Sequence, residues 1–576
     1  MRFLILLVAT CLCAQIPARD SRNINIPHTD THFTMPVYKT SAEWEARATH
    51  LRTQILFAAG LTPMPQRGPL MPQIFGRIER KGYSIEKVLL QTLPGYYLGG
   101  NLYRPLGKGA KLPAVLAPHG HWAYGRLENT SINSVPARAI SLAIQGYVVF
   151  SYDMTGYNDT VQTPHEFDGP REQLWNFSPL GLQLWNSIRV IDFMESLPDV
   201  DPQRIVMTGE SGGGTQTFLT TAVDSRIKVS APVNMISASM QGGAICENAP
   251  GLRLGTSNLE IAAMMAPRPM LMVSATGDWT RNTPREEFPA VRSIYELYDR
   301  AADLETIHID APHNYNQPSR EAMYTFFASR VLGAPKGRAV SEQRIAVEKP
   351  QDLLALHGRP LPENALTYDR LFEQWIAAAT RQSAAITDRQ VIRQRLSLAL
   401  ASEWPSKILS ERSGERIVLS REGRGDRIPG IWIEAGKKVT LLVHPDGAQV
   451  ARQTPAKSES LLMIDAFQTG AAIAPRDRSV KHFLTFNQSD DACRVQDILT
   501  ALRFLQQSGY TDIRLRGEGR AAVWTLFAAA VAEIPVTLDA DLAEFTGTDA
   551  DFLRSFFVPG IQRAGGLRAA QVAAGR

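Results

Sequence analysis

The chain has 576 residues, and its 61 lysines and arginines nearly balance 57 aspartates and glutamates. This length predicts two or three domains, and a composition of 44% hydrophobic and 20% charged residues is ordinary for a globular protein. No basic stretch is interleaved with aromatic residues, so we expect no nucleic-acid partner.

The first residues, MRFLILLVATCLCAQ (residues 1–15), have the pattern of an export signal. Arg2 precedes an apolar run that ends at Cys13, and the small Ala14 stands near a plausible cleavage site. The run is too short to cross a bilayer, and Thr10 makes a lipoprotein anchor the weaker alternative. No later segment is apolar enough to be a transmembrane segment, so we expect a soluble protein that is periplasmic or secreted.

Two cysteines, Cys246 and Cys493, remain outside this predicted signal, and they lie far apart in the sequence. Nothing in their spacing suggests a disulfide, and buried free thiols are the simpler interpretation. No spacing of cysteine and histidine resembles a zinc site. The sequence therefore predicts neither a metal nor another cofactor.

Residues 41–60 have apolar residues at helical spacing and end in glycine, which predicts a helix. From about residue 83 the pattern changes, and residues 87–105 have the pattern of two strands around a turn. Further along, short apolar runs alternate with amphipathic segments, and the runs lie at 114–120, 147–153, 204–210, 228–234, 269–278 and 305–310. Such alternation is typical of a mostly parallel sheet with helices on both faces, so the predicted fold class is α/β.

The run at 204–210 leads into a G-x-S-x-G motif formed by Gly209, Ser211 and Gly213. So short a motif also arises by chance, and then it is only a glycine-rich turn that contains a serine. Its setting favours chemistry, because Ser211 stands directly after an apolar strand and before a helix. A sharp turn at that place presents a nucleophile, and the glycines make room for it.

An acid and a base follow Ser211 in the order used by folds with such a turn. Asp278 ends the run at 269–278, and His313 follows the run at 305–310, so both stand at the same predicted sheet edge as the serine. Ser211 would attack an ester carbonyl, and His313 would accept the proton and return it to the leaving alcohol. Asp278 would orient the imidazole and stabilise its charged form.

The oxyanion of the tetrahedral intermediate needs two N–H donors. The backbone of Gly212, directly after the nucleophile, is the first candidate. The second is expected in the loop that follows the run at 114–120, at Gly120 or His121.

Each triad residue has a simpler interpretation as well. A lone aspartate after a strand is often a cap, and a lone histidine in a loop is often solvated. The competing histidines are less well placed, because His119 and His121 precede the serine and His308 falls inside a strand. His165 also lies before the serine.

Five segments together resemble the α/β-hydrolase superfamily: PHGHW (118–122), YDMTGYN (152–158), GESGGGTQT (209–217), APRPMLMVSATGD (266–278) and PHNYN (312–316). The sequence is most similar in kind to bacterial acetyl xylan esterases and dienelactone-hydrolase-like proteins, over a predicted catalytic domain at 37–335. A dienelactone hydrolase carries a cysteine nucleophile, so Ser211 favours simple ester hydrolysis. The resemblance also makes Glu247 the rival acid, since some relatives carry the acid after the preceding strand.

Trp122, Tyr157 and Trp279 fall in loops at the predicted catalytic edge, as do Tyr124 and Trp175. Flat aromatic rings stack on sugars, so the first three are candidate substrate-binding residues, although they would equally serve to pack loops onto the sheet. With export, this favours a serine esterase acting on small-molecule or polysaccharide esters, of the acetyl xylan type. A glucuronoyl esterase and a prolyl-oligopeptidase-like peptidase remain alternatives.

Residues 413–576 repeat part of the pattern, after a predicted helical connector at 336–412. KVTLLVHPDG echoes LPAVLAPHG, LLMIDAFQTG echoes VVFSYDMTG, and DIRLRGEGRAAVW echoes RIVMTGESGGGTQ. Gly519 stands where the first copy has Ser211, so the second copy has no nucleophile. We predict a degenerate, truncated α/β-hydrolase-like domain that packs against the first, shapes its cleft, or binds carbohydrate without catalysis.

Overall fold

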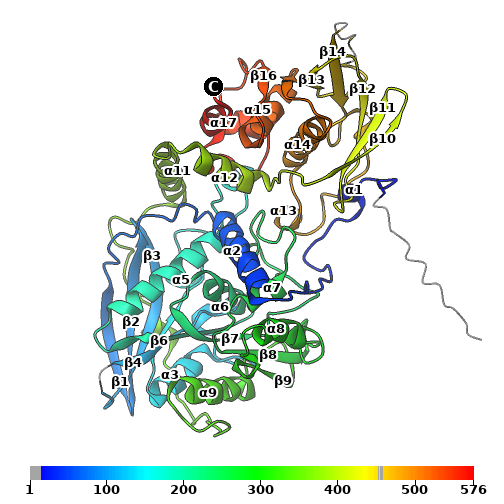
Figure 1. Ribbon diagram of the computed structural model, residues 1–576. Helices are drawn as coiled ribbons and strands as arrows, with labels where there is room; N and C mark the ends of the chain where they lie inside the picture. The colour runs from blue at the N-terminus through cyan, green and yellow to red at the C-terminus, as the bar shows by residue number, and fades with distance from the viewer. Residues whose placement is uncertain (1–14, 110, 452, 454–457) are drawn as a thin grey trace, which may run out of the picture. The chain divides into compact units, whose positions relative to one another are not determined.

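The protein is described by a computed structural model that covers residues 15–109, 111–451, 453 and 458–576 (Figure 1). Nearly all of the predicted export signal at 1–15 lies outside these described residues. Within them, no helix has the length and apolar character needed to cross a bilayer.

The chain divides into two compact units. The N-terminal unit contains Pro27–Gln382 and the short segment Lys481–Asn487. The C-terminal unit contains the described residues up to Ile26, together with Ser383–Val480 and Gln488–Arg576. The chain thus passes from one unit to the other several times.

In the described part of the N-terminal unit, nine strands form one sheet in the order β1-β2-β3-β5-β4-β6-β7-β8-β9 (Figure 1). The strands are β1 (Gln73–Arg80), β2 (Tyr83–Leu93), β3 (Tyr96–Pro105), β4 (Leu112–Leu116), β5 (Val148–Tyr152), β6 (Val200–Glu210), β7 (Ile227–Val233), β8 (Met270–Gly277) and β9 (Leu304–Pro312). The first three strands pair antiparallel, and β3 is antiparallel to β5. From β5 to β9 all neighbours are parallel, so their carboxyl ends lie along one edge.

Alternating side chains of the central strands build two cores, one on each face of this sheet. Val115 on β4 is in register with Val149 on β5 and Val206 on β6, and all three belong to one core. Their neighbours Leu116 and Phe150 are aligned in the same way and belong to the other core. A strand with apolar residues at every position is therefore buried on both sides, as the unbroken apolar runs predict.

Helices cover both faces of the large sheet (Figure 1). Side chains of α3 (Val135–Gln145) and α9 (Gln317–Val331) enter one core, and side chains of α5 (Pro179–Ser196) enter the other. The other described helices of this unit are α2 (Ser41–Ala58), α4 (Pro170–Leu174), α6 (Gly212–Val223), α7 (Asn258–Ala263), α8 (Glu287–Glu296), α10 (Pro350–Leu353), most of α11 (Tyr368–Ala384) and α13 (Phe483–Phe486), with short 3-10 turns η1 (Gly125–Leu127), η2 (Ile245–Glu247) and η3 (Ala301–Asp303). The α/β-hydrolase fold class is confirmed for this unit.

The described C-terminal unit holds a second sheet with the order β10-β11-β12-β14-β13-β15-β16. Its strands are β10 (Ile408–Ser413), β11 (Arg416–Arg421), β12 (Ile428–Ile433), β13 (Lys438–Val443), β14 (Glu459–Ile464), β15 (Asp512–Gly517) and β16 (Thr537–Ala540). Its helices are α1 (Ser21–Ile24), α12 (Arg389–Leu400), α14 (Asp490–Gln507), α15 (Ala521–Val531), α16 (Asp549–Ser555) and α17 (Gly566–Ala574), with one 3-10 turn, η4 (Gly470–Ala472). A second sheet domain is therefore present, as predicted.

The second sheet has the strand order of the first seven strands of the large sheet. Strand directions match as well: β12 is antiparallel to β14, and β14, β13, β15 and β16 are mutually parallel neighbours. Strands β8 and β9 of the large sheet precede Asp278 and His313. They have no counterpart among the described strands of the C-terminal unit.

The division into units differs from the boundaries predicted at 37–335, 336–412 and 413–576. The predicted connector at 336–412 is divided between the two units. Its helix α11 (Tyr368–Ala384) belongs to the N-terminal unit up to Gln382, and α12 belongs to the C-terminal unit. The Trp375 indole on α11 donates to the carbonyl of Trp175 in its own unit. Long-range contacts of this kind, which a linear pattern does not contain, decide the boundary.

Both described cysteines, Cys246 and Cys493, are free and buried, as the sequence predicted.

Candidate active site

Ser211 occupies the sharp turn between β6 and α6. Its backbone has φ 56° and ψ −123°, a conformation that residues other than glycine rarely adopt. Its N–H donates to Val233 O on β7 at 3.1 Å, which anchors the turn to the neighbouring strand. A Cβ added at Gly209 would lie 2.5 Å from Gly213 O, so the two glycines of the motif are required by close packing of the turn on itself.

His313 and Asp278 meet at the carboxyl ends of β9 and β8. His313 Nδ1 lies 2.7 Å from Asp278 Oδ2, and the carboxylate is almost fully buried, with 1% of its side chain exposed. The other carboxylate oxygen accepts from Thr280 N at 2.7 Å and from Thr280 Oγ1 at 2.5 Å. A carboxylate held in this way fixes the ring of the histidine and keeps the proton on Nδ1.

The second ring nitrogen of His313 is left as an acceptor. Nε2 is buried and has no hydrogen-bond partner among the described residues, so it does not bond the Ser211 hydroxyl here. The imidazole stacks on Trp122, with ring centroids 6.0 Å apart, and lies against Trp279 at 4.5 Å. Two of the three predicted substrate-binding aromatic residues, Trp122 and Trp279, thus contact the imidazole of His313. These contacts limit the motion of the ring and its access to water.

The predicted oxyanion donors are only partly available. The N–H of Gly120 donates to Glu210 Oε1 at 3.1 Å, so this N–H is already engaged and is not free to bind an oxyanion. No hydrogen bond from the N–H of Gly212 or His121 is formed within the described residues. The imidazole of His121 packs against Gly212, because a Cβ added at Gly212 would lie 2.5 Å from His121 Cε1.

The carboxylate of Glu210, the residue before the serine, is fully buried and takes four donors. Oε1 accepts from Gly120 N at 3.1 Å, from Trp122 Nε1 at 2.8 Å and from Asn133 Nδ2 at 2.9 Å. Oε2 pairs with Arg138 Nη1 at 2.5 Å, and neither side chain of this ion pair is exposed. One charge therefore holds the strand end, the loop after β4 and helix α3 together.

Arg138 extends the same network to the histidine loop. Its guanidinium lies over the ring of Tyr315 at 4.5 Å, and its Nη2 donates to Pro118 O at 3.2 Å. Burial raises the pKa of Tyr315 to about 12, so its hydroxyl stays protonated and lies 2.7 Å from Thr208 Oγ1 on β6. The loop that carries His313 is in this way tied to the strand that carries Ser211.

Glu247, the rival acid, lies in η2, and no hydrogen bond or ion pair among the described residues joins it to His313. Its Oε2 accepts from the backbone N–H groups of Gly243 and Ala244 at 2.8 and 3.0 Å, and its Oε1 accepts from Thr215 Oγ1 at 3.0 Å. A carboxylate occupied on both oxygens by its own loop and by α6 has the contacts of a structural residue.

Tyr157, the third candidate substrate-binding residue, packs among histidines. Its ring meets His119 at 5.0 Å and His165 at 4.8 Å, both edge to face, and burial raises the pKa of its hydroxyl. Burial also lowers the pKa of His119 to about 3, so this imidazole stays neutral and accepts from Met154 N at 3.0 Å. Of the two other loop aromatics, Tyr124 is exposed and Trp175 is buried.

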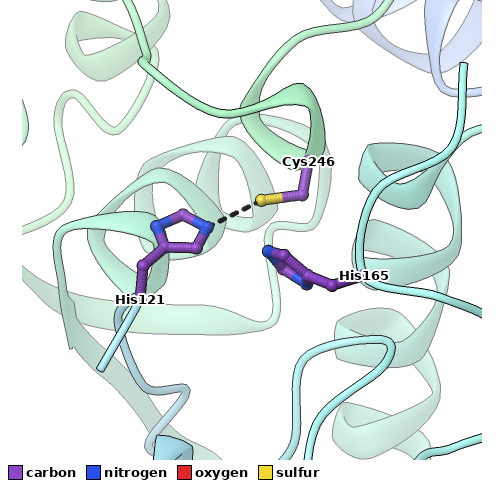
Figure 2. A group of neighbouring side chains, drawn as sticks. All are labelled: His121, His165 and Cys246. Carbon is purple, nitrogen blue, oxygen red and sulfur yellow. Dashed lines mark hydrogen bonds between the residues drawn. The ribbon is translucent and has the colours of Figure 1, made fainter. Parts of the chain in front are cut away.

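The turn at Ser211 is called the elbow below. Near this elbow, the side chains of His121, His165 and Cys246 come together (Figure 2). The sequence offers no spacing signal for this group, because each member lies in a different loop. It likewise does not single out Glu210 and Arg138, although Glu210 recurs as Glu518 in the echoed segment.

No protein-family model matches the chain. Over 242 residues it is 29% identical to the "Putative hydrolase YtaP" of Bacillus subtilis (strain 168), a match that covers 39% of this chain and 80% of that protein. Among solved structures, methylesterase BT1017 is 30% identical with a TM-score of 0.52, covering 60% of this chain and 78% of that one. A glucuronoyl esterase from Solibacter usitatus, 14% identical with a TM-score of 0.41 over 53% of this chain and 99% of its own, is too distant to bear on the substrate.

The fold, the turn at Ser211 and the likeness to the methylesterase and the hydrolase of Bacillus subtilis place the protein in one class. The chain belongs to the α/β-hydrolase superfamily, and the first of these solved structures is a methylesterase.

Replacing Glu210 by glutamine tests the buried network, because it removes the charge and keeps the size. Arg138 then stays buried without a counter-charge, and we expect the free energy of unfolding in urea to fall by about 3–5 kcal/mol. The matched control is Glu518→Gln, at the echoed position, where the carboxylate pairs with Arg516, whose side chain is 41% exposed. Loss of that surface pair should cost less than about 1 kcal/mol, and equal losses in the two variants would contradict the role given to Glu210.

Proposed function

We propose that this chain is an exported serine esterase that hydrolyses carboxylic esters of carbohydrates. The observation that carries the proposal is the His313–Asp278 pair, with a 2.7 Å bond on Nδ1 and an unpartnered Nε2, at the same sheet edge as the strained Ser211 turn. Likeness to a methylesterase at 30% identity supports the esterase class. Export rests on the sequence of residues 1–15 alone.

The reaction divides among the groups as follows. His313 Nε2 takes the proton of Ser211 Oγ as the oxygen attacks the ester carbonyl, and the imidazolium is stabilised by Asp278 Oδ2. The N–H groups of Gly212 and His121 receive the negative charge on the carbonyl oxygen. Collapse of this intermediate expels the alcohol, which leaves with the proton from Nε2, and water then releases the acid from the acyl-serine by the same steps.

Two ester types remain distinct within this proposal. In an acetyl ester of a sugar, the type predicted from the sequence, the sugar is the leaving alcohol and acetate is released. In a methyl ester, the type that the name of the solved relative indicates, methanol leaves and the sugar carries the acid. Trp122 and Trp279, which contact His313, are the surfaces on which we expect the sugar to stack.

We further infer that the C-terminal unit is a duplicated hydrolase scaffold without catalytic chemistry. Its sheet has the strand order and directions of β1 to β7. Gly519 has φ +52°, close to the value at Ser211, so a positive φ is kept at this position although the side chain is absent. Binding of carbohydrate without catalysis is one of the roles that we propose for this unit.

A substrate screen separates the alternatives. Acetylated xylan, methyl-esterified uronates, glucuronate esters and a prolyl peptide are offered to the purified full chain, and acetate, methanol, free uronate and amine are measured. Release of acetate or methanol supports the carbohydrate esterase. Cleavage of the peptide alone, with all esters intact, would replace it by a peptidase.

Replacing Ser211 by alanine removes the nucleophile. We expect kcat/KM for p-nitrophenyl acetate to fall by at least about 10⁴-fold, with an unchanged thermal midpoint. The matched control is Gly519→Ser combined with Ser211→Ala, which restores a serine at the echoed turn and should restore no activity. An alanine variant as fast as the wild type would refute serine catalysis at this site.

Replacing Asp278 by asparagine, and separately Glu247 by glutamine, decides which carboxylate serves His313. Asparagine offers its amide to Nδ1 and favours the wrong tautomer, so we expect kcat to fall by about 10⁴-fold. Glutamine at position 247 should lower kcat less than about 10-fold, because no hydrogen bond or ion pair among the described residues joins Glu247 to the histidine. The reverse ranking of the two variants would assign the acid to Glu247.

A further inference from the structure

Three side chains from separate loops converge beside the elbow (Figure 2). His121 follows β4, His165 lies between β5 and α4, and Cys246 lies in η2. One nitrogen of each histidine and the sulfur of Cys246 all lie within 4.8 Å of one another. The mechanism proposed above uses none of these three side chains.

The free nitrogen of His165 is presented to this group with its lone pair available. Its Nδ1 lies 2.8 Å from the carbonyl oxygen of Thr155, and since a carbonyl only accepts, Nδ1 carries the proton. Nε2 is then an acceptor, and it is buried without a partner among the described residues. A buried acceptor left without a donor is costly, so its presence calls for a ligand. A backbone carbonyl on the other ring nitrogen is also the usual support of a metal-binding histidine.

The other two members already lie close together. His121 Nε2 is 2.9 Å from Cys246 Sγ, and the rings of His121 and His165 have centroids 5.1 Å apart. In a tetrahedral zinc site the metal stands about 2.0–2.1 Å from nitrogen and about 2.3 Å from sulfur, so bound nitrogen and sulfur atoms are separated by more than 3 Å. Small rotations of the side chains therefore suffice to admit an ion.

The surroundings are acidic. The thiol of Cys246 is buried, and the carboxylates of Glu247 and Glu166 are near enough to act on its charge. The same carboxylates that disfavour a bare thiolate favour a cation, and a bound divalent ion deprotonates its thiol ligand. Two imidazoles and one thiolate select zinc-like ions and exclude magnesium and calcium.

We propose that His121 Nε2, His165 Nε2 and Cys246 Sγ bind one Zn²⁺-type ion, with water at the fourth position. Three protein ligands and one open position are a known arrangement for zinc. The ring of His121 also lies directly against Gly212, so the ion would hold the loop between β4 and η1 close to the elbow. The proposal concerns binding and does not depend on which ester the enzyme hydrolyses.

Cobalt provides a direct readout of this site. The full chain, stripped with a chelator, is titrated with Co²⁺ and its absorption recorded, since cobalt bound to a thiolate gives a charge-transfer band that histidine and carboxylate sites lack. We expect one Co²⁺ per chain with this band, displaced by one Zn²⁺, and a raised thermal midpoint on Zn²⁺ loading. No such band at saturating Co²⁺ would overturn the proposal.

Variants assign the band to these residues. Cys246→Ser should abolish the band, and His165→Gln should weaken Zn²⁺ binding by at least about 100-fold. The matched controls are Cys493→Ser, at the other buried free thiol, and His357→Gln, at an exposed histidine, and both should bind like the wild type. Loss of the band in Cys493→Ser, or its survival in Cys246→Ser, would refute the assignment.

A labelling experiment on the wild type covers the case in which a variant does not fold. Zn²⁺ should slow alkylation of Cys246 by iodoacetamide at least about 10-fold, because the bound sulfur is no longer a free nucleophile. Cys493, read from the same digest by mass spectrometry, should react at an unchanged rate. Equal protection of both cysteines, or protection of neither, would contradict a site at Cys246.

Discussion

One buried charge organises the site. The Glu210 carboxylate is fully buried, and it is compensated by Arg138 and by donors from Gly120, Trp122 and Asn133. An uncompensated carboxylate at such a place costs several kcal/mol, so the loop after β4, helix α3 and the end of β6 are held in position together in the folded state. The turn at the nucleophile and the loop opposite it thus share a single electrostatic support, which also explains why the N–H of Gly120 is already engaged.

The sequence predicted what depends on local pattern and chain order. Unbroken apolar runs indicated the parallel strands, and the order of Ser211, Asp278 and His313 indicated that all three stand at one sheet edge, where Asp278 does meet His313. It did not indicate which oxygen or N–H each group would use, because that depends on burial by distant segments. The engaged N–H of Gly120, the separation of Glu247 from His313, and the unit boundary inside the predicted connector all have this origin.

The two units show which features of the scaffold are independent of chemistry. The strand order recurs in the second sheet, and the positive φ that follows β6 recurs after β15, whereas the buried charge does not recur. Glu518, the echo of Glu210, pairs with Arg516 near the surface. Under the duplication proposed above, the second copy lacks both the nucleophile and the buried ion pair that supports its turn in the first copy.

The positive φ shared by Ser211 and Gly519 has a consequence for stability. A residue with a side chain in this region carries strain of about 1–3 kcal/mol, whereas glycine carries almost none. A positive φ is thus present at the matching position of both sheets, once on a serine and once on a glycine. The backbone shape belongs to the scaffold, and only the presentation of a hydroxyl group makes it costly. Under the duplication proposed above, the C-terminal copy is free of the conflict between stability and activity that a strained nucleophile imposes on the N-terminal copy.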